Sequence, residues 1–323
     1  MTTPIDRSAS WPYEDGEPGR YSYARDGSPT ATAAEAALGT LEGGRALLFS
    51  SGMAATATVL LTLLRPGTTV ALAAGSYYGT GSLLTHLDSW GVSHIEFDQT
   101  GAPPPEVDLV WVEAPANPML TMPDFGAAVR HEARVVCDST IATPLQLRPL
   151  ELGCDVALHS ATKVLGGHDD LLAGVVVVGD DGLYERLRET RRLTGAVASA
   201  DTAWLLLRGL ETLEVRVARQ TETARALAEL LAGHAAVTTV RYPGFGGLVS
   251  FDVADAEAAH RVETGVRLIV NATSLGGTHT KLESRHRWEG ERCPPGLLRL
   301  SAGLEPAEEL WADLERALAG ATA

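Results

Sequence analysis

Residues 159–168 read HSATKVLGGH, and this stretch determines how the rest of the chain is interpreted. It follows a short apolar run, 155–158, that we predict to be a buried strand. Lys163, beside a buried strand end, can lose its proton through desolvation and then attack a carbonyl. The hydroxyls of Ser160 and Thr162 could hold a phosphate, and the two glycines permit a close approach of the backbone. A solvated loop lysine is the simpler alternative, and this stretch alone leaves it open.

Two further predicted strands also end in polar groups. The run 107–112 is followed closely by Asn117, and the run 133–137 is followed directly by Asp138. Ligands of open parallel sheets bind beyond the carboxyl ends of the strands, so we expect these groups to lie near Lys163. A Schiff-base lysine, a phosphate cradle and a carboxylate for a ring nitrogen are what pyridoxal phosphate requires. Taken by itself, Asp138 could equally be a helix cap or a turn residue.

The order of predicted elements indicates an α/β fold. From about residue 52 to 178, short apolar strands alternate with helices, which is typical of a mostly parallel sheet between helices. One of these helices is expected at 123–132. Residues 201–233 carry a long helical pattern, interpreted as two helices that meet near Gly209. We divide the chain into an N-terminal arm (1–30), a large domain (31–233) and a small C-terminal α+β domain (234–323).

Composition excludes several classes of function. The chain has 26 Lys+Arg and 41 Asp+Glu, and the resulting net charge of −15 argues against nucleic acid as a partner. No apolar run reaches the roughly 18 residues of a membrane span, and residues 1–19 lack the apolar region of a signal peptide. Three scattered cysteines and nine histidines without ligand spacing argue against a disulfide framework or a metal site. We therefore expect a cytoplasmic enzyme without metal, membrane or nucleic-acid partner.

Over about residues 20–320, the chain resembles the Cys/Met-metabolism family of pyridoxal-phosphate enzymes, the cystathionine γ-synthase/γ-lyase group. The resemblance rests on short motifs in the family's order. They are YAR at 23–25, LEGG at 41–44, SGM at 51–53, YG at 78–79, PANP at 115–118, Asp138, RPLELG at 148–153, HSATK at 159–163, SLGG at 274–277 and RLS at 299–301. The last third is especially similar to bacterial cystathionine γ-lyase-like sequences. The resemblance implies the aspartate-aminotransferase-like, type I fold of these enzymes.

The resemblance also implies roles for single residues around the cofactor. Lys163 would carry pyridoxal phosphate as a Schiff base and then act as a general acid and base. Asp138 would keep the pyridine nitrogen protonated, and Tyr78 would stack on the ring as a second catalytic residue. The groups expected at the phosphate are the N–H groups of Gly52 and Met53, which open a predicted helix, and the hydroxyls of Ser160 and Thr162.

Other matches concern the substrate and a second subunit. Arg299 matches the arginine that binds the substrate α-carboxylate, for which a guanidinium fork is well suited. Asn117 and Ser274 match residues that touch the cofactor or that carboxylate. Tyr23 and Arg25 match residues that reach the phosphate from the neighbouring subunit. The resemblance thus implies a homo-oligomer, a dimer of dimers, with active sites shared across subunits and a small amino acid as substrate.

Two functions remain open, and they use the same residues. The first is a pyridoxal-phosphate lyase that acts on a sulfur-containing amino acid by γ- or β-elimination, like the cystathionine γ-lyases of trans-sulfuration. The alternative is a γ-replacement transferase that joins an activated homoserine to a nucleophile, like cystathionine γ-synthase or O-acylhomoserine sulfhydrylase. Thr273 departs from the glutamate that many family members carry at a position facing the distal part of the substrate. That departure puts a preference for the far amino group of cystathionine in doubt.

Two other classes fit the sequence less well. A catalytically dead homologue that serves as a binding protein is disfavoured because Lys163, Asp138 and Arg299 are all present. A nucleotide-binding Rossmann protein is disfavoured because no Gly-x-Gly-x-x-Gly follows the first predicted strand. The segment near Gly244 and the N-terminal arm are shorter than in most members of the family, which bears on the oligomer.

Overall fold

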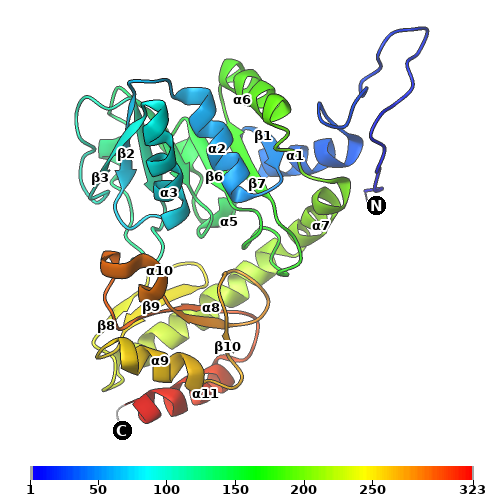
Figure 1. The fold of residues 1–323 in the computed structure, drawn as a ribbon. Helices are drawn as coiled ribbons and strands as arrows, with labels where there is room; N and C mark the ends of the chain where they lie inside the picture. Colours follow the sequence, from blue (N-terminus) through cyan, green and yellow to red (C-terminus); the bar gives the residue numbers. More distant parts are fainter. Residues whose placement is uncertain (1–2, 322–323) are drawn as a thin grey trace.

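The computed structural model describes residues 3–321, which form two halves, each built around its own sheet (Figure 1). The first sheet has the strand order β1-β7-β6-β5-β4-β2-β3. Its strands are β1 (Arg45–Phe49), β2 (Thr69–Ala73), β3 (Ser93–Phe97), β4 (Leu109–Glu113), β5 (Arg134–Asp138), β6 (Val156–His159) and β7 (Gly174–Val178). Neighbouring strands from β6 to β3 are parallel, whereas β7 is antiparallel to both β1 and β6. The sheet is therefore mostly parallel, as the sequence predicts.

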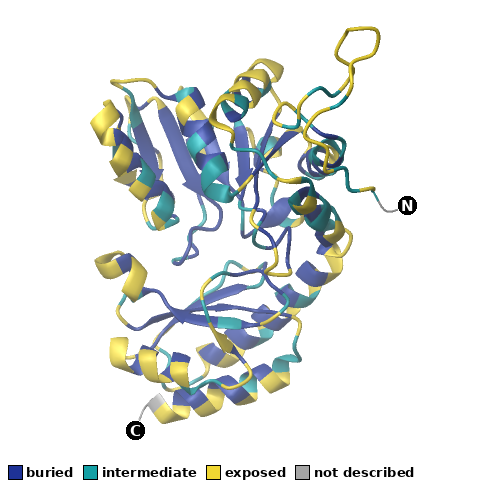
Figure 2. Cartoon of the chain, turned by 45° about the vertical axis from the view of Figure 1, so that its right-hand side comes forward, coloured by how far each residue is buried: buried dark blue, intermediate teal, exposed yellow. Residues whose placement is uncertain are grey.

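Helices cover both faces of this sheet, and inner strands such as β4 and β7 are buried at every position, whereas the edge strand β3 is mostly exposed (Figure 2). One face is covered by α2 (Gly52–Leu63), α3 (Tyr78–Leu87) and α6 (Asp181–Thr194). The other face is covered by α1 (Pro29–Glu42), α4 (Phe125–Ala128) and α7 (Ala200–Leu210). Successive residues of one strand point to opposite faces, so Leu47 and Leu48 enter different cores. This two-sided burial explains why the strands read as continuous apolar runs.

The second sheet has the order β10-β11-β12-β9-β8 and lies below the first in Figure 1. Its strands are β8 (Thr239–Arg241), β9 (Leu248–Asp252), β10 (Val270–Asn271), β11 (Lys281–Ser284) and β12 (Leu297–Ser301). Leu298 and Leu300 of β12 pack in a core with α9 (Ala256–Gly265) and α11 (Ala307–Ala321). Arg299, between them, points to the opposite face, toward the first half of the chain.

The long helix α8 (Leu213–Ala232) connects the two halves. Leu213 and Val217, near its beginning, pack in the core of the first half, and Leu227 and Leu231 pack in the core of the second. It follows α7 after a short break, as expected for two helices that meet near Gly209. A Cβ atom at Gly209 would lie 2.4 Å from the carbonyl oxygen of Gly166, so glycine permits this close approach. The domain division expected at residue 233 falls at the end of α8, whose last turns already belong to the second core.

The N-terminal arm lies on the surface of α1 and α7. The backbone N–H of Asp6 donates to Thr30 Oγ1 at 2.9 Å, and Trp204 Nε1 donates to the carbonyl oxygen of Thr3 at 3.0 Å. Between these anchors and α1, an exposed hairpin-like loop projects away from the body of the chain (Figures 1 and 2). Helix α1 then begins at Pro29, where Ser28 caps it and proline fits the first helical position.

Some predicted elements differ from the observed ones. The helix expected at 123–132 is reduced to α4, because Asp124 caps it only at Phe125 and the chain leaves the helix at Val129. The sequence interpretation contained no counterpart of α1, β1, β10, β11 or α10 (His286–Glu289). Smaller helical elements are α5 (Thr143–Gln146) and 3₁₀ turns at Asp88–Trp90, Pro149–Leu152 and Gly290–Arg292. None of the helices in residues 3–321 is long and apolar enough to cross a membrane.

Gly174 at the start of β7 fixes the position at which α2 begins. A Cβ atom there would lie 2.2 Å from the carbonyl oxygen of Ser51, the N-cap of α2, and 2.9 Å from Ala55 Cβ. We predict that Gly174→Ala lowers the free energy of unfolding by about 2–3 kcal/mol, measured by denaturant unfolding. Gly179→Ala, just after the same strand, is the control, because nothing lies within 4 Å of a Cβ there. Equal effects of the two substitutions would contradict this account.

Candidate active site

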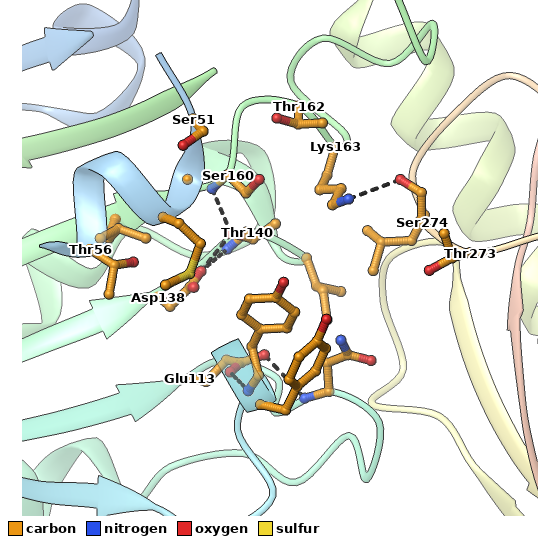
Figure 3. A pocket seen from close by; sticks show the side chains of 18 of the residues that line it. Ser51, Thr56, Glu113, Asp138, Thr140, Ser160, Thr162, Lys163, Thr273 and Ser274 are labelled. Atoms are coloured by element: carbon orange, nitrogen blue, oxygen red, sulfur yellow. Dashed lines mark hydrogen bonds between the residues drawn. The ribbon is translucent and has the colours of Figure 1, made fainter. Parts of the chain in front are cut away.

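A cavity of about 250 Å³ lies between the two halves, at the carboxyl ends of β4, β5 and β6. Residues that follow these strands and residues at the start of α2 line it on the side of the first sheet (Figure 3). Arg299 of β12 and the loop 273–275 line it from the second half. The arrangement agrees with the rule that parallel sheets bind ligands beyond their strand ends.

Lys163 follows β6 and is one of only two lysines in the whole chain. Its Nζ lies in the cavity and donates a hydrogen bond of 2.9 Å to Ser274 Oγ across it (Figure 3). Burial, together with the charges of Arg299 and Lys281, lowers the pKa of Lys163 to about 8. The other lysine, Lys281, pairs with Asp169 at 2.6 Å. Lys163 is therefore the lysine placed to act as a nucleophile or base.

Asp138 ends β5 on the opposite wall of the cavity and is buried. Its Oδ1 accepts hydrogen bonds from the backbone N–H of Thr140 at 3.0 Å and from Thr140 Oγ1 at 2.5 Å. Thr140 Oγ1 in turn accepts from the backbone N–H of Ser160 at 2.8 Å. Burial raises the pKa of the Asp138 carboxyl, while the bonds from Thr140 and the nearby His159 oppose that rise. Asp138 Oδ2 has no hydrogen bond with any described residue and is left for a ligand.

The N-terminus of α2 presents unpaired donors to the same cavity. Ser51 caps the helix, its Oγ accepting from the N–H of Ala54 at 3.0 Å. Within residues 3–321, the N–H groups of Gly52 and Met53 have no hydrogen-bond partner. A Cβ atom at position 52 would lie 2.9 Å from Ser160 Cβ and Oγ, so glycine leaves this space open. Free N–H groups and the positive end of the helix dipole favour an anion there.

Thr162 also lines the cavity, but its hydroxyl is already engaged. Its Oγ1 donates to the carbonyl oxygen of Ala173 at 3.2 Å and accepts from the N–H of Ala173 at 3.0 Å. A direct bond from Thr162 to a phosphate would require this hydroxyl to change partner. Ser160 is therefore the better placed of the two hydroxyls expected at the phosphate.

Two adjacent tyrosines line the cavity, of which the sequence analysis considered only the second for the cofactor. Tyr78 begins α3 and is 37% exposed, and its ring centroid lies 4.9 Å from that of Tyr77. The Tyr77 ring covers Gly79, where a Cβ atom would lie 2.5 Å from Tyr77 Cε1 and 3.2 Å from Met53 Sδ. Burial, followed by the neighbouring Tyr78, raises the pKa of Tyr77 to about 12. Tyr77 is thus a second candidate for stacking, and the Tyr-Tyr doublet was the signal available in the sequence.

Arg299 is buried at the far side of the cavity. Its Nη1 donates to Asn117 Oδ1 at 2.8 Å, and its Nη2 donates to the carbonyl oxygen of Ser274 at 3.0 Å and to Glu283 Oε2 at 2.9 Å. Its Nε has no partner among the described residues. Burial, and then the charge of Arg285, lowers the pKa of Arg299 to about 10. The unused N–H groups of this fork remain available for a carboxylate.

Ser274 has a strained backbone at the point where both halves meet. Its φ of +83° lies in the left-handed region that residues other than glycine rarely adopt. Arg299 holds its carbonyl oxygen, and Lys163 donates to its side chain. Strain of this kind persists where surrounding contacts enforce it, often at functional sites.

Sequence reasoning missed the residues that hold the site residues in place. Glu113 is the last residue of β4, and its carboxylate accepts from the N–H groups of Tyr77 at 2.6 Å and Asn117 at 3.1 Å. Burial, and then the charge of Asp138, raises the pKa of Glu113 well above its usual value. Its position directly after a predicted strand was the available signal. Arg285, which also lines the cavity, had no such signal.

The two arm residues are not brought to this cavity within one chain. Tyr23 is 48% exposed, and the guanidinium of Arg25 lies 5.3 Å from the centre of its ring. Tyr23 pairs with Ser10 in the arm, Arg25 is also exposed, and neither residue lines the cavity. Their assignment to the site of a neighbouring subunit stays a prediction.

The donor set fits pyridoxal phosphate. Lys163 supplies an amine of lowered pKa, Asp138 supplies a free carboxylate oxygen, and the space beside Gly52 would accommodate an anionic group. Nothing in residues 3–321 groups three or more His, Cys, Asp or Glu side chains suitably for a metal ion. The cavity is therefore suited to an organic phosphate with a carbonyl and a basic ring nitrogen.

Comparisons with known proteins agree with this chemistry. Residues 1–319 match the family model described as Cys/Met metabolism PLP-dependent enzyme. Cystathionine beta-lyase MetC of Bacillus subtilis is 36% identical, over 98% of this chain and 91% of its own length. Cystathionine gamma-synthase of Mycobacterium bovis is 37% identical, over 98% of this chain and 92% of its own. The crystal structure of cystathionine gamma-lyase CalE6 from Micromonospora echinospora superposes with a TM-score of 0.93 at 36% identity, covering 98% and 93% of the two chains.

The lowered pKa of Lys163 gives a prediction for the cofactor-free protein. At pH 8 roughly half of the Lys163 amines should be neutral, against well under 1% for an ordinary lysine of pKa about 10.4. Acylation of Lys163, followed by peptide mapping, should therefore rise with a midpoint near pH 8. Arg299→Gln removes one of the neighbouring charges, so it should move the midpoint to higher pH. A midpoint at the pH of an ordinary lysine in both proteins would contradict the assignment.

Proposed function

The chain belongs to the Cys/Met metabolism family of PLP-dependent enzymes, and we propose that it is a lyase that cleaves a sulfur-containing amino acid. Its cofactor is pyridoxal 5'-phosphate, and its substrate is an amino acid. The proposed reaction is γ-elimination, with β-elimination as the close variant, as in the cystathionine lyases that it resembles. Because its relatives include both lyases and a synthase, the choice depends on the substrate side of the cavity.

The observation that favours elimination is the neutral lining of the cavity at Thr273. Arg299 has unused N–H groups toward the cavity. Arg285, the second arginine there, bonds Glu283 at 3.1 Å and Glu289 at 2.7 Å through its terminal nitrogens, and like Arg299 it leaves its Nε unpaired among the described residues. A replacement enzyme must bind a second reactant in its cavity in addition to the first, whereas a lyase only releases a thiol. Thr273 provides a neutral hydroxyl where a charged group would bind a distant amino group, which favours a substrate whose sulfur carries no second amino acid.

In the proposed mechanism, Arg299 binds the substrate α-carboxylate, with Asn117 and Ser274 fixing the guanidinium. Bound pyridoxal phosphate supplies an electron sink that stabilises negative charge at the substrate Cα. Asp138 keeps the ring nitrogen of the cofactor protonated. Lys163 Nζ, with its pKa of about 8, can accept a proton from a substrate carbon and return one to the departing sulfur.

The cofactor itself is held by groups from several elements. We assign the phosphate to the N–H groups of Gly52 and Met53, with Ser160 beside them and Thr162 at the rim. Tyr78 remains the proposed stacking residue, and Tyr77, whose side chain is less exposed, is the second candidate. Stacking over the ring would orient it while Asp138 holds its nitrogen.

A γ-replacement transferase is the alternative, because a cystathionine gamma-synthase is as similar to the chain as the lyases are. Product analysis separates the two. With L-cystathionine alone, a γ-lyase releases 2-oxobutanoate and a β-lyase releases pyruvate. With an O-acylhomoserine and cysteine, a synthase forms a new thioether. We expect release of an oxo acid to exceed thioether formation. Predominant thioether formation would establish the alternative, and neither product would refute the proposed substrate class.

We also infer that the active enzyme is at least a dimer, and by family resemblance a dimer of dimers. Tyr23 pairs with Ser10 in the arm, Tyr23 and Arg25 are both exposed, and neither lines the cavity of its own chain. A two-fold contact makes both sites equivalent, so each arm would complete the partner's site.

Mixed oligomers test this arrangement. Arg25→Ala and Lys163→Ala proteins should each be nearly inactive. Refolded together in equal amounts, half of the dimers should be mixed, and each mixed dimer regains one site with both residues intact. Roughly a quarter of wild-type activity should therefore return.

The control pairs Lys163→Ala with Asp138→Ala, whose residues line the same cavity of one chain. That mixture should not regain activity, because neither chain then offers an intact cavity. Recovery in the control, or none in the test with mixed dimers shown to be present, would contradict a shared site.

The three cysteines are consistent with a reducing compartment. Cys137, Cys154 and Cys293 are all buried free thiols. Disulfides are rare in the cytosol, where thiols are kept reduced. We therefore propose a cytoplasmic location, which fractionation of the producing cells would test.

A further inference from the structure

Behind the wall of the cavity, a glutamate and a histidine are buried together. Glu42 ends α1 and His159 ends β6, and both side chains are 1% exposed. Glu42 Oε2 lies 3.5 Å from His159 Nε2. Among the described residues, neither oxygen of the Glu42 carboxylate has a hydrogen-bond partner, and His159 Nε2 has none either. Neither side chain lines the cavity, and the mechanism above does not use either of them.

The contacts of the imidazole fix where one proton lies. His159 Nδ1 is 3.1 Å from the carbonyl oxygen of Ser139. A carbonyl oxygen only accepts, so Nδ1 carries a proton. If the imidazole were neutral, the lone pair of Nε2 would face the ionised Glu42 carboxylate without water between them, and the two would repel each other. A second proton must therefore be shared by His159 Nε2 and Glu42.

A third charged group decides which side holds that proton. Asp138 pairs with Leu158 in the sheet, directly before His159, and Ser139, which His159 bonds, directly follows Asp138. His159 is the next residue after Leu158, so its side chain points to the opposite face of the sheet from that of Asp138. The Asp138 carboxylate therefore favours a positive imidazole across the sheet, without direct contact. Burial lowers the pKa of His159, but the Glu42 and Asp138 carboxylates raise it by more.

The remaining titratable neighbours do not compete for this proton. Cys137 of β5 is close enough to Glu42 and Asp138 to respond to both charges. Burial, followed by Cys154, raises the pKa of Cys137 well above its usual value, so that thiol stays neutral. The charged groups around His159 are thus Glu42 from α1 and Asp138 from β5.

We propose that Glu42 and His159 are positioning residues that keep Asp138 ionised: Glu42 holds His159 as an imidazolium, whose charge stabilises the Asp138 carboxylate. The proposal concerns the cofactor assigned to the cavity and rests on the family membership of the chain. Asp138 needs this support because burial favours its neutral form. An ionised Asp138 holds a proton on the cofactor's ring nitrogen, and a neutral one does not. The order of charges from α1 to the cavity is negative, positive, negative.

The direct test is Glu42→Gln, which removes the charge and nearly conserves the volume. With ¹⁵N-labelled pyridoxal phosphate, the wild-type protein should show a protonated ring nitrogen across pH 6–8.5. In Glu42→Gln, the midpoint at which the ring nitrogen loses its proton should fall by about one pH unit. The cofactor should also bind about tenfold more weakly. Neither readout depends on turnover or on the substrate.

Glu35→Gln is the matched control on the same helix. Glu35 accepts from the N–H of Leu48 at 3.0 Å and pairs with Arg191 at 2.5 Å, away from His159. It should lower stability as much as Glu42→Gln or more, because it leaves a buried arginine without its partner. The ring nitrogen signal should remain that of the wild type. An equal shift in both variants would reduce Glu42 to a structural role.

A measurement on the unaltered protein covers the case in which Glu42→Gln does not fold. In the cofactor-free wild type, histidine ¹⁵N spectra should show His159 with both ring nitrogens still protonated at pH 7, where an ordinary histidine is mostly neutral. The signal is assigned by its loss in His159→Gln. A neutral His159 at pH 7 would overturn the proposal, as would an unchanged ring nitrogen in a folded Glu42→Gln protein. If the chain bound no pyridoxal phosphate at all, the assignment of the cofactor would fail, whereas the state of His159 would still be tested.

Discussion

In the first sheet, Glu113 of β4 is paired with Asp138 of β5, and Asp138 is paired with Leu158 of β6. Because these three strands are parallel and in register, their carboxyl ends meet at one edge. The polar residues at and after these strand ends therefore lie close together. The strands themselves are buried, so the charged groups gather at this edge. The cavity, the placement of Lys163 and the arrangement of charges behind Asp138 all follow from this register.

The second sheet contributes by the alternation of side chains along its strands. Its apolar residues pack on α9 and α11, which turns the intervening Arg299 toward the first half. The bond from Lys163 to Ser274 and the bond from Arg299 to Asn117 then cross between the halves. A carboxylate bound by Arg299 therefore lies on the opposite wall from Asp138, as a substrate that extends across the cofactor requires. A small motion between the halves would alter both bonds at once.

The sequence allowed the fold class and the strand-end groups to be predicted because both depend on local patterns. Asp138 directly follows one apolar run and Lys163 comes shortly after another, and the rule for parallel sheets places them together. Contacts that depend on long-range pairing could not be found this way. Glu283 supports Arg299 only because β11 and β12 pair in the register that sets them opposite each other. Glu42 lies 117 positions before His159 in the chain, and nothing local indicates that α1 ends against β6.

The central claim is that one lysine at the end of β6 binds the cofactor covalently, and the composition of the chain makes that claim easy to test. Reduction of the cofactor-loaded protein with borohydride fixes a Schiff base to its lysine, and the chain has only Lys163 and Lys281. Mass spectrometry of the digested protein should find the reduced cofactor on the peptide that contains Lys163, and none on that of Lys281. Cofactor on Lys281, or on neither lysine in a protein that retains it, would contradict the account.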